Sequence, residues 1–221
     1  MEINKLQKWL IAKKITEKHD LTPLVNRIKN MSHNENIKTN IRTISSKSQD
    51  DYHPIPYQVA IIDFEGTPVI CLGVMIHDTL FTYYIKSHDY LDMFHLFILE
   101  ILLQIHELTF FSFSDYEQKE ILSILSKLIE KGYNLKKYTY LENLTVVNLQ
   151  EGRFESLFEA LLSTGDRSFT GDPLFRNIKL INKLFITKKF EEIISHNYSC
   201  LLNESVILER WVKTYNISGG D

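Results

Sequence analysis

The stretch VAIIDFEGTPVICLGV, residues 59 to 74, places two carboxylates, Asp63 and Glu65, at the end of an otherwise apolar, strand-like run. Aspartate and glutamate are both depleted in β-strands, so sheet formation does not explain their presence. Side chains at positions i and i+2 of a strand point to the same side of the sheet, which brings these two acids together. Neighbouring carboxylates repel each other unless a cation lies between them, and they raise each other's pKa. The stretch therefore predicts a strand that ends in a cation site, with at least one acid of raised pKa.

The elements expected around this stretch define a fold class. Three strand-like runs, at residues 59–64, 68–74 and 80–85, are separated by short turns. They are followed by a helix over 91–106, a strand over 108–113, a helix over 116–131, a strand over 144–149 and then helical patterns. Strands joined by short turns pair antiparallel, whereas strands separated by a helix favour parallel pairing. The order predicts an α/β fold, a mixed sheet flanked by helices.

The N-terminal part of the chain has a different character. Residues 1–52 are predicted to form an N-terminal helical arm and polar linker, ahead of an α/β domain over residues 53–221. The polar stretch, rich in Ser, Asn and Lys, covers residues 32–54. The first 52 residues contain 10 Lys and Arg against 6 Asp and Glu, so the arm suits contact with phosphates or with a protein partner. The alternative is a solvated surface, which is the more common role of scattered charges.

Composition sets the cellular context that we expect. Hydrophobic residues make up 44% of the chain and charged residues 24%, which is typical of a globular protein. The two cysteines, Cys71 and Cys200, lie far apart, which favours a reducing compartment and argues against a disulfide framework or a zinc site built from cysteines. Charges interrupt both the N-terminal segment and the most apolar run, so neither a signal peptide nor a membrane span is expected. We therefore predict a cytoplasmic protein without a membrane partner.

The element order, with acids on the first strand of the predicted domain, resembles the ribonuclease H-like fold of DnaQ-type exonucleases. The first motif of that family, Asp-x-Glu, is matched by Asp63 and Glu65. Its second motif begins the helix after the fourth strand, where this chain has SDYEQKE, residues 114 to 120. On this resemblance Glu117 takes the metal-facing position and Asp115 is the fallback. A helix cap by Ser114 or Asp115, with Glu117 at the positive end of the helix dipole, explains the same residues without any chemistry.

The C-terminal part, from about residue 152, resembles that of YprB-like ribonuclease H-fold nucleases, in which an HNxxD motif opens the last helix. In HNYSC, His196 and Asn197 match this motif, but Cys200 stands where the family has a metal-binding aspartate. Glu204 lies one helical turn further along the same face, so it is a possible replacement ligand. His196 is the candidate base, with a structural histidine at the helix start as an equally weighted alternative.

The resemblance implies a metal-dependent, 3'–5' exonuclease-like hydrolase of phosphodiester bonds, acting on single-stranded ends of DNA or RNA. The implied cofactors are two Mg²⁺ or Mn²⁺ ions. The implied ligand positions are Asp63, Glu65, Glu117, Asp115 and Cys200, with His196 and Glu204 as the catalytic candidates. A thiol is a poor ligand for Mg²⁺. Cys200 therefore leaves open an alternative, a catalytically degenerate domain that binds nucleic acid or a protein.

Overall fold

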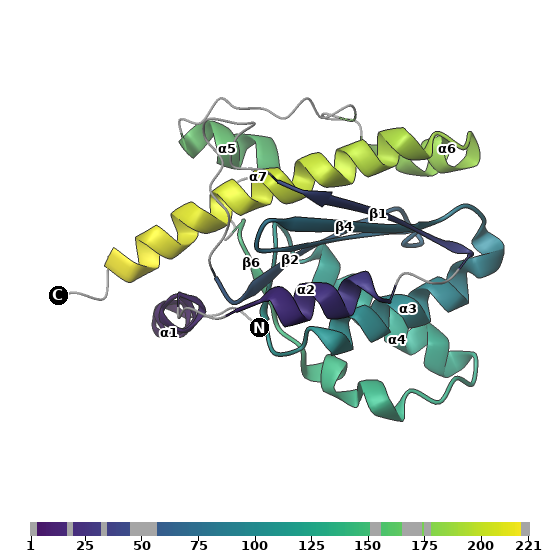
Figure 1. Cartoon of the computed structure of the whole chain (residues 1–221), viewed down its shortest axis with the longest axis horizontal. Coiled ribbons are helices and arrows are strands. Elements are labelled where there is room, and N and C mark those ends of the chain that lie inside the picture. Colours follow the sequence, from purple (N-terminus) through teal and green to yellow (C-terminus); the bar gives the residue numbers. More distant parts are fainter. Residues whose placement is uncertain are drawn as a thin grey trace.

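The computed structural model describes residues 4–16, 20–31, 35–44, 57–150, 156–164, 174 and 178–217 (Figure 1). Among these residues, six strands form one sheet in the order β1-β4-β3-β2-β5-β6. The strands are β1 (Ile37–Thr43), β2 (Val59–Glu65), β3 (Cys71–Ile76), β4 (Thr79–Ile85), β5 (Thr109–Ser112) and β6 (Val146–Asn148). Neighbours from β1 to β2 pair antiparallel, whereas β5 and β6 continue parallel to β2. The predicted α/β class, a mixed sheet flanked by helices, is confirmed.

Helices cover both faces of this sheet (Figure 1). One face carries α2 (Thr22–Lys29), α3 (Leu91–Gln104) and α4 (Tyr116–Glu130). The other face carries the long α7 (Phe190–Ile217), with α1 (Lys5–Ile15) and α5 (Leu157–Thr164) packed against it. Shorter elements connect these helices: the 3-10 helices η1 (His88–Tyr90), η2 (Lys136–Asn143) and η3 (Ile178–Leu180), and the helix α6 (Ile181–Ile186). The elements predicted between residues 59 and 149 are present, with their ends shifted by up to three residues.

Strand β2 contributes to two hydrophobic cores, one on each face of the sheet. Ile62 belongs to the core under α3 and α4, whereas Val59 and Ile61 belong to the core under α7. This alternation follows from strand geometry, in which successive side chains point to opposite faces. Asp63 and Glu65 continue the row of Val59 and Ile61. Both acids therefore lie on the α7 face, where the apolar core ends.

The structure corrects the prediction for the polar stretch over residues 32–54. Residues 37–43 form β1, an edge strand that pairs with β4 along its length, from Ile37 opposite Ile85 to Thr43 opposite Thr79. A polar linker was the wrong interpretation here, because an edge strand needs few buried side chains and Ile37 is the buried residue of β1. The two acids consequently lie on the second strand of the chain. The predicted domain boundary falls in residues 45–56, outside the described residues.

The N-terminal helices are packed parts of the domain. α1 begins with a reciprocal capping box between Asn4 and Gln7, and it buries Ala12 and Ile15 in the core under α7. α2 buries Ile28 in the core on the opposite face. The helical arm is therefore present as two helices, each docked on a different face. Within the described part of the chain, no helix combines the length and the apolar composition that crossing a membrane requires.

Candidate functional site

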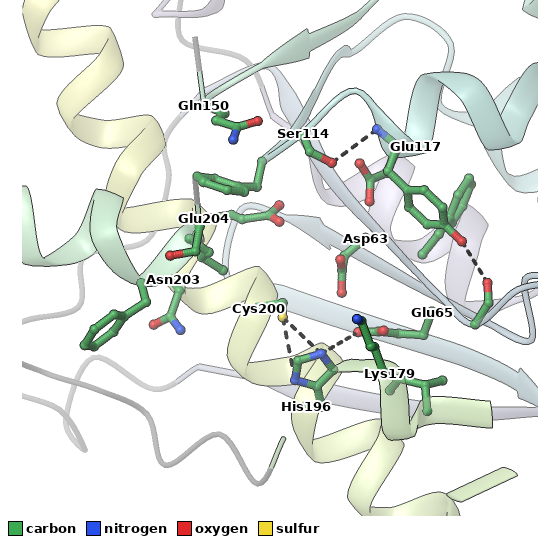
Figure 2. Close-up of a pocket in the computed structure, with 18 of the residues that line it drawn as sticks. Asp63, Glu65, Ser114, Glu117, Gln150, Lys179, His196, Cys200, Asn203 and Glu204 are labelled. Carbon is green, nitrogen blue, oxygen red and sulfur yellow. Dashed lines mark hydrogen bonds and ion pairs between the residues drawn. The ribbon is translucent and has the colours of Figure 1, made fainter. Parts of the chain in front are cut away.

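A pocket of about 710 Å³ opens on the α7 face of the sheet, at the point where β2 ends (Figure 2). Its wall is built from the end of β2, the segment after β5, the first turn of α4, α5, the middle of α7 and the segment from η3 to α6. Most of the site residues predicted from the sequence line this pocket: Asp63, Glu65, Glu117, His196, Cys200 and Glu204. The structure thus brings together residues that are up to 141 positions apart in the chain.

Helix α7 supplies half of these residues from a single face. His196, Cys200 and Glu204 follow one another at four-residue intervals, which places them one above the other on a helix. The prediction that His196 and Asn197 open the last helix is wrong, because α7 begins six residues earlier, at Phe190. A histidine at the helix start is therefore no longer an alternative explanation for His196, which is 3% exposed inside the pocket wall.

The two acids at the start of α4 have different environments. Asp115 lies outside the pocket, where its Oδ2 is 2.6 Å from Nζ of Lys119 and its side chain is 62% exposed. The Ser114 hydroxyl accepts a hydrogen bond of 3.1 Å from the Tyr116 amide, whereas the side chain of Asp115, the N-cap residue, makes no capping hydrogen bond. Glu117 is 4% exposed and lines the pocket. The structure therefore places Glu117, and not the fallback Asp115, at the site.

Asp63, Glu117 and Glu204, here called the acidic group, point toward one another in the pocket (Figure 2). Burial, and after it the charge of Asp63, raises the pKa of Glu117 to about 8. Burial also raises the pKa of Glu204 well above its usual range, and the charges of Asp63 and Glu117 add to this effect. The expectation that the gathered acids raise one another's pKa is confirmed for both glutamates.

Two oxygens of the acidic group stand out. Oε2 of Glu117 and Oε2 of Glu204 are buried, and neither has a hydrogen-bond partner among the described residues. A buried polar atom without a partner is costly, and for a carboxylate oxygen the cost is larger because of its charge. A divalent cation bound beside such oxygens would offset this cost and reduce the repulsion within the acidic group.

Asn197 holds Asp63 in place. Its Nδ2 donates a hydrogen bond of 2.7 Å to Oδ2 of Asp63, and its Oδ1 accepts one of 3.1 Å from the Thr82 hydroxyl. The amide lies directly over Gly73, the residue that pairs with Asp63 across β2 and β3. A β-carbon at position 73 would lie 2.6 Å from Nδ2 of Asn197. Asn197 was not predicted to be a site residue, although a glycine inside a strand is itself a signal of close approach.

Gly73→Ala is expected to lower the free energy of unfolding by about 2–4 kcal/mol, because the new methyl group displaces the Asn197 amide. Asn197→Ala alone loses hydrogen bonds but opens space above Gly73. The double variant should therefore lose less than the sum of the single variants, by about 1 kcal/mol or more. Denaturant unfolding of the four proteins measures this coupling, and strictly additive losses would contradict it. Gly132→Ala is the control, because its site is open and only the positive φ of +84° opposes the change.

Glu65, His196 and Cys200 form a second cluster in the same pocket, here called the mixed triad. Nε2 of His196 lies 3.3 Å from Oε1 of Glu65 and 3.7 Å from Sγ of Cys200. One oxygen, one nitrogen and one sulfur of the three side chains all lie within 4.8 Å of one another. Glu65 and His196 are buried, and Cys200 is partly exposed toward the pocket. The pocket therefore contains two donor sets of different chemistry.

The rim of the pocket includes residues that the sequence did not single out. Lys179 in η3 is exposed, and it is the sole Lys or Arg in the pocket lining that the structure describes. The hydroxyl of Tyr116 donates to the carbonyl of Gly66 at 2.8 Å, and Nδ2 of Asn182 donates to the carbonyl of Thr67 at 3.0 Å. These bonds tie α4 and α6 to the turn after β2. No sequence signal distinguishes Lys179 from other surface lysines.

Comparison of the chain with protein-family models, with curated proteins and with solved structures finds no match in any of the three. The interpretation of the pocket consequently rests on its geometry and chemistry. The ribonuclease H-like resemblance stays a prediction from motifs and element order.

Proposed function

We propose that the protein is a metal-dependent hydrolase of nucleic-acid phosphodiester bonds, with its reaction centre in this pocket. The observation that carries the proposal is the convergence of four buried carboxylates, from β2, α4 and α7, on one opening. Gathering buried acids is unfavourable, and a divalent cation is the partner that offsets this cost. The chain separates these acids widely, so their meeting is a property of the fold.

The topology supports the ribonuclease H-like part of the proposal. Three consecutive antiparallel strands, β2 to β4, are followed through helices by the parallel strands β5 and β6, which is the order on which the resemblance rests. β2 lies between β3 and β5, where the antiparallel and parallel parts of the sheet meet. In open α/β sheets, ligand sites gather beyond the carboxyl ends of strands at such a change in strand order. Asp63 and Glu65 occupy this end of β2.

The acidic group offers the ligand type that hard cations prefer. Asp63, Glu117 and Glu204 would hold Mg²⁺ or Mn²⁺ through carboxylate oxygens, two of which have no hydrogen-bond partner among the described residues. Such ions, when bound, activate a water and stabilise charge on the leaving oxygen. Asn197 keeps the carboxylate of Asp63 oriented toward the pocket, and Lys179 offers a positive charge to a substrate phosphate at the rim. Glu204 thereby takes the role that the resemblance gives to an aspartate at position 200.

His196 is placed to accept a proton in this reaction. Its Nε2 lies 3.3 Å from Oε1 of Glu65, inside the same pocket, and histidine is the side chain that most often serves as a general base. The same nitrogen faces Cys200, so a base role requires that Nε2 carry no metal ion. The two uses of this atom exclude each other.

A binding domain without catalysis is the second candidate function. It is favoured by one observation, the thiol of Cys200 in the pocket at the position where the resemblance places a ligand for Mg²⁺. Thiols bind Mg²⁺ poorly. In this case the pocket and its rim would bind single-stranded nucleic acid or a protein without cleaving a bond.

The test is cleavage of single-stranded DNA and RNA, labelled at either end, in the presence of Mg²⁺ or Mn²⁺. Glu204→Gln is expected to reduce cleavage by about 100-fold or more, because it removes a charged ligand and keeps the side-chain volume. Asp115→Asn is the matched control and should leave cleavage unchanged, since that acid lies outside the pocket. Full activity of Glu204→Gln would refute the role of Glu204. Absence of cleavage by the wild type with either ion would favour the binding domain.

A further inference from the structure

The mixed triad is not explained by a centre that binds hard cations alone. Its members offer a carboxylate oxygen, an imidazole nitrogen and a thiol sulfur, from β2 and from two successive turns of α7. Glu65 and His196 lie side by side in the pocket wall, and the thiol of Cys200 is within reach of the same histidine nitrogen. The three donor atoms face one another across a space that opens into the pocket.

Two of the three distances between these atoms match the edges of a tetrahedral zinc site, and the third is below 4.8 Å. Zinc binds nitrogen and oxygen at about 2.1 Å and sulfur at about 2.3 Å, so tetrahedral angles place nitrogen about 3.4 Å from oxygen and about 3.6 Å from sulfur. The structure has 3.3 Å between Nε2 of His196 and Oε1 of Glu65, and 3.7 Å between Nε2 and Sγ of Cys200. Octahedral Mg²⁺, with bonds of about 2.1 Å, brings adjacent ligands to about 3.0 Å, which is closer than either distance.

The donor types point to the same ion. Thiolate, imidazole and carboxylate are the three side-chain ligands that Zn²⁺ accepts in proteins, whereas Mg²⁺ selects oxygen. A three-ligand zinc site keeps its fourth position for water or substrate. Here the fourth side is the pocket itself, which also contains the acidic group.

We propose that Glu65, His196 and Cys200 bind one Zn²⁺ ion. The inference deepens the proposed function, because it makes the pocket a mixed centre in which the acidic group holds a hard cation and the mixed triad holds a soft one. Cys200 is then a ligand for a different metal, and not the remnant of a lost aspartate. His196 acts in this centre as a ligand and not as the base.

Cobalt substitution tests the site without nucleic acid. The reduced protein, freed of metal by a chelator, is titrated with Co²⁺, which is expected to produce a thiolate-to-metal charge-transfer absorption and the strong visible bands of tetrahedral cobalt. One equivalent of Zn²⁺ should abolish both, and millimolar Mg²⁺ should not. Cys200→Ser is expected to remove the charge-transfer absorption and to weaken Zn²⁺ binding by at least about 100-fold, since even outer-shell changes at metal sites cost 10–100-fold. Absence of the absorption in the wild type, or its survival in Cys200→Ser, would overturn the proposal.

Cys71→Ala provides the matched control, because Cys71 is the other cysteine of the chain and is fully buried on β3. It should retain the charge-transfer absorption. A measurement on the wild type covers the case in which Cys200→Ser does not fold. Zn²⁺ should slow alkylation of Cys200 by iodoacetamide. Mass spectrometry of the peptide that contains Cys200 measures this rate. Equal alkylation rates with and without Zn²⁺ would also overturn the proposal.

The two proposals fail separately. Zinc binding without cleavage of any oligonucleotide would refute the hydrolase and leave the zinc site standing. Cleavage in Mg²⁺ without zinc binding would refute the zinc site alone. Cys200→Asp distinguishes the ions directly, because replacement of sulfur by oxygen should lower the affinity for Zn²⁺ and raise the affinity for Mn²⁺.

Discussion

Asp63→Asn is expected to abolish hydrolysis and, at the same time, to make the metal-free protein more stable. The charge of Asp63 raises the pKa of both Glu117 and Glu204, so its removal relieves repulsion on two buried neighbours. The amide oxygen of the substituted side chain can still accept the hydrogen bond from Asn197. We expect a loss of about 1,000-fold in kcat/KM, equivalent to about 4 kcal/mol in the transition state. The gain in stability should be about 1–2 kcal/mol, a rise of several degrees in Tm.

Thermal unfolding with and without Mn²⁺ measures the predicted change in stability. The wild type should gain stability from millimolar Mn²⁺, because the ion binds the folded state preferentially, and Asp63→Asn should gain much less. Asp115→Asn serves as the control for removal of one negative charge, since its carboxylate is exposed and paired with Lys119. A variant at Asp63 that keeps its activity, or that unfolds at a lower temperature than the wild type, would contradict the role of this residue.

The second large effect concerns pH. We expect the free energy of unfolding of the metal-free protein to fall as the pH rises from about 6.5 to about 8. In this range Glu117 keeps its proton in the folded state, where its pKa is about 8, but has lost it in the unfolded state, where the pKa is 4.5. The folded state therefore binds more protons, and stability falls with pH by up to about 1.4 kcal/mol per unit for one such group. Glu204 acts in the same direction because its pKa is also raised.

Another buried group opposes this effect at lower pH. Burial lowers the pKa of His95 from 6.5 to about 4, so below 6.5 the unfolded state takes up a proton that the folded state does not. This histidine makes stability rise with pH between about 4 and 6.5, against the effect of Glu117. Denaturant unfolding across the pH range should show the decline above 6.5 in the wild type and a smaller one in Glu117→Gln. An identical decline in both proteins would exclude Glu117 as its source.

Some features of the fold and the site were predictable because the sequence encodes them locally. Successive side chains of β2 point to opposite faces of the sheet. Asp63 and Glu65 are two residues apart, so both point to the α7 face. The four-residue spacing of Cys200 and Glu204 placed them together on one face of a helix. These predictions depend on the local periods of strands and helices, which are fixed by backbone geometry.

The features that were missed depend on tertiary contacts. β1 is polar because it lies at the edge of the sheet, so its composition is that of a loop. The start of α7 six residues before His196 was not predicted, because the resemblance places the HNxxD motif at the start of the last helix. Asn197 and Gly73 are 124 residues apart in the sequence. Their contact forms because α7 packs on the sheet, so it cannot be predicted from either residue alone. The mixed triad has one member on β2 and two on α7. The distance between these elements is set by tertiary packing, so no sequence spacing predicts the cluster.

The long helix α7 has a consequence for how the pocket is adjusted. One helix carries His196, Cys200 and Glu204, so helix geometry fixes their spacing along its axis at about 6 Å per four residues. The distance between this helix and β2 determines the arrangement of both donor sets, and the hydrogen bond from Asn197 to Asp63 helps to fix that distance. α1 packs against the same helix through Ala12 and Ile15. The packing of α1 is therefore expected to influence the position of the helix that carries three residues of the pocket.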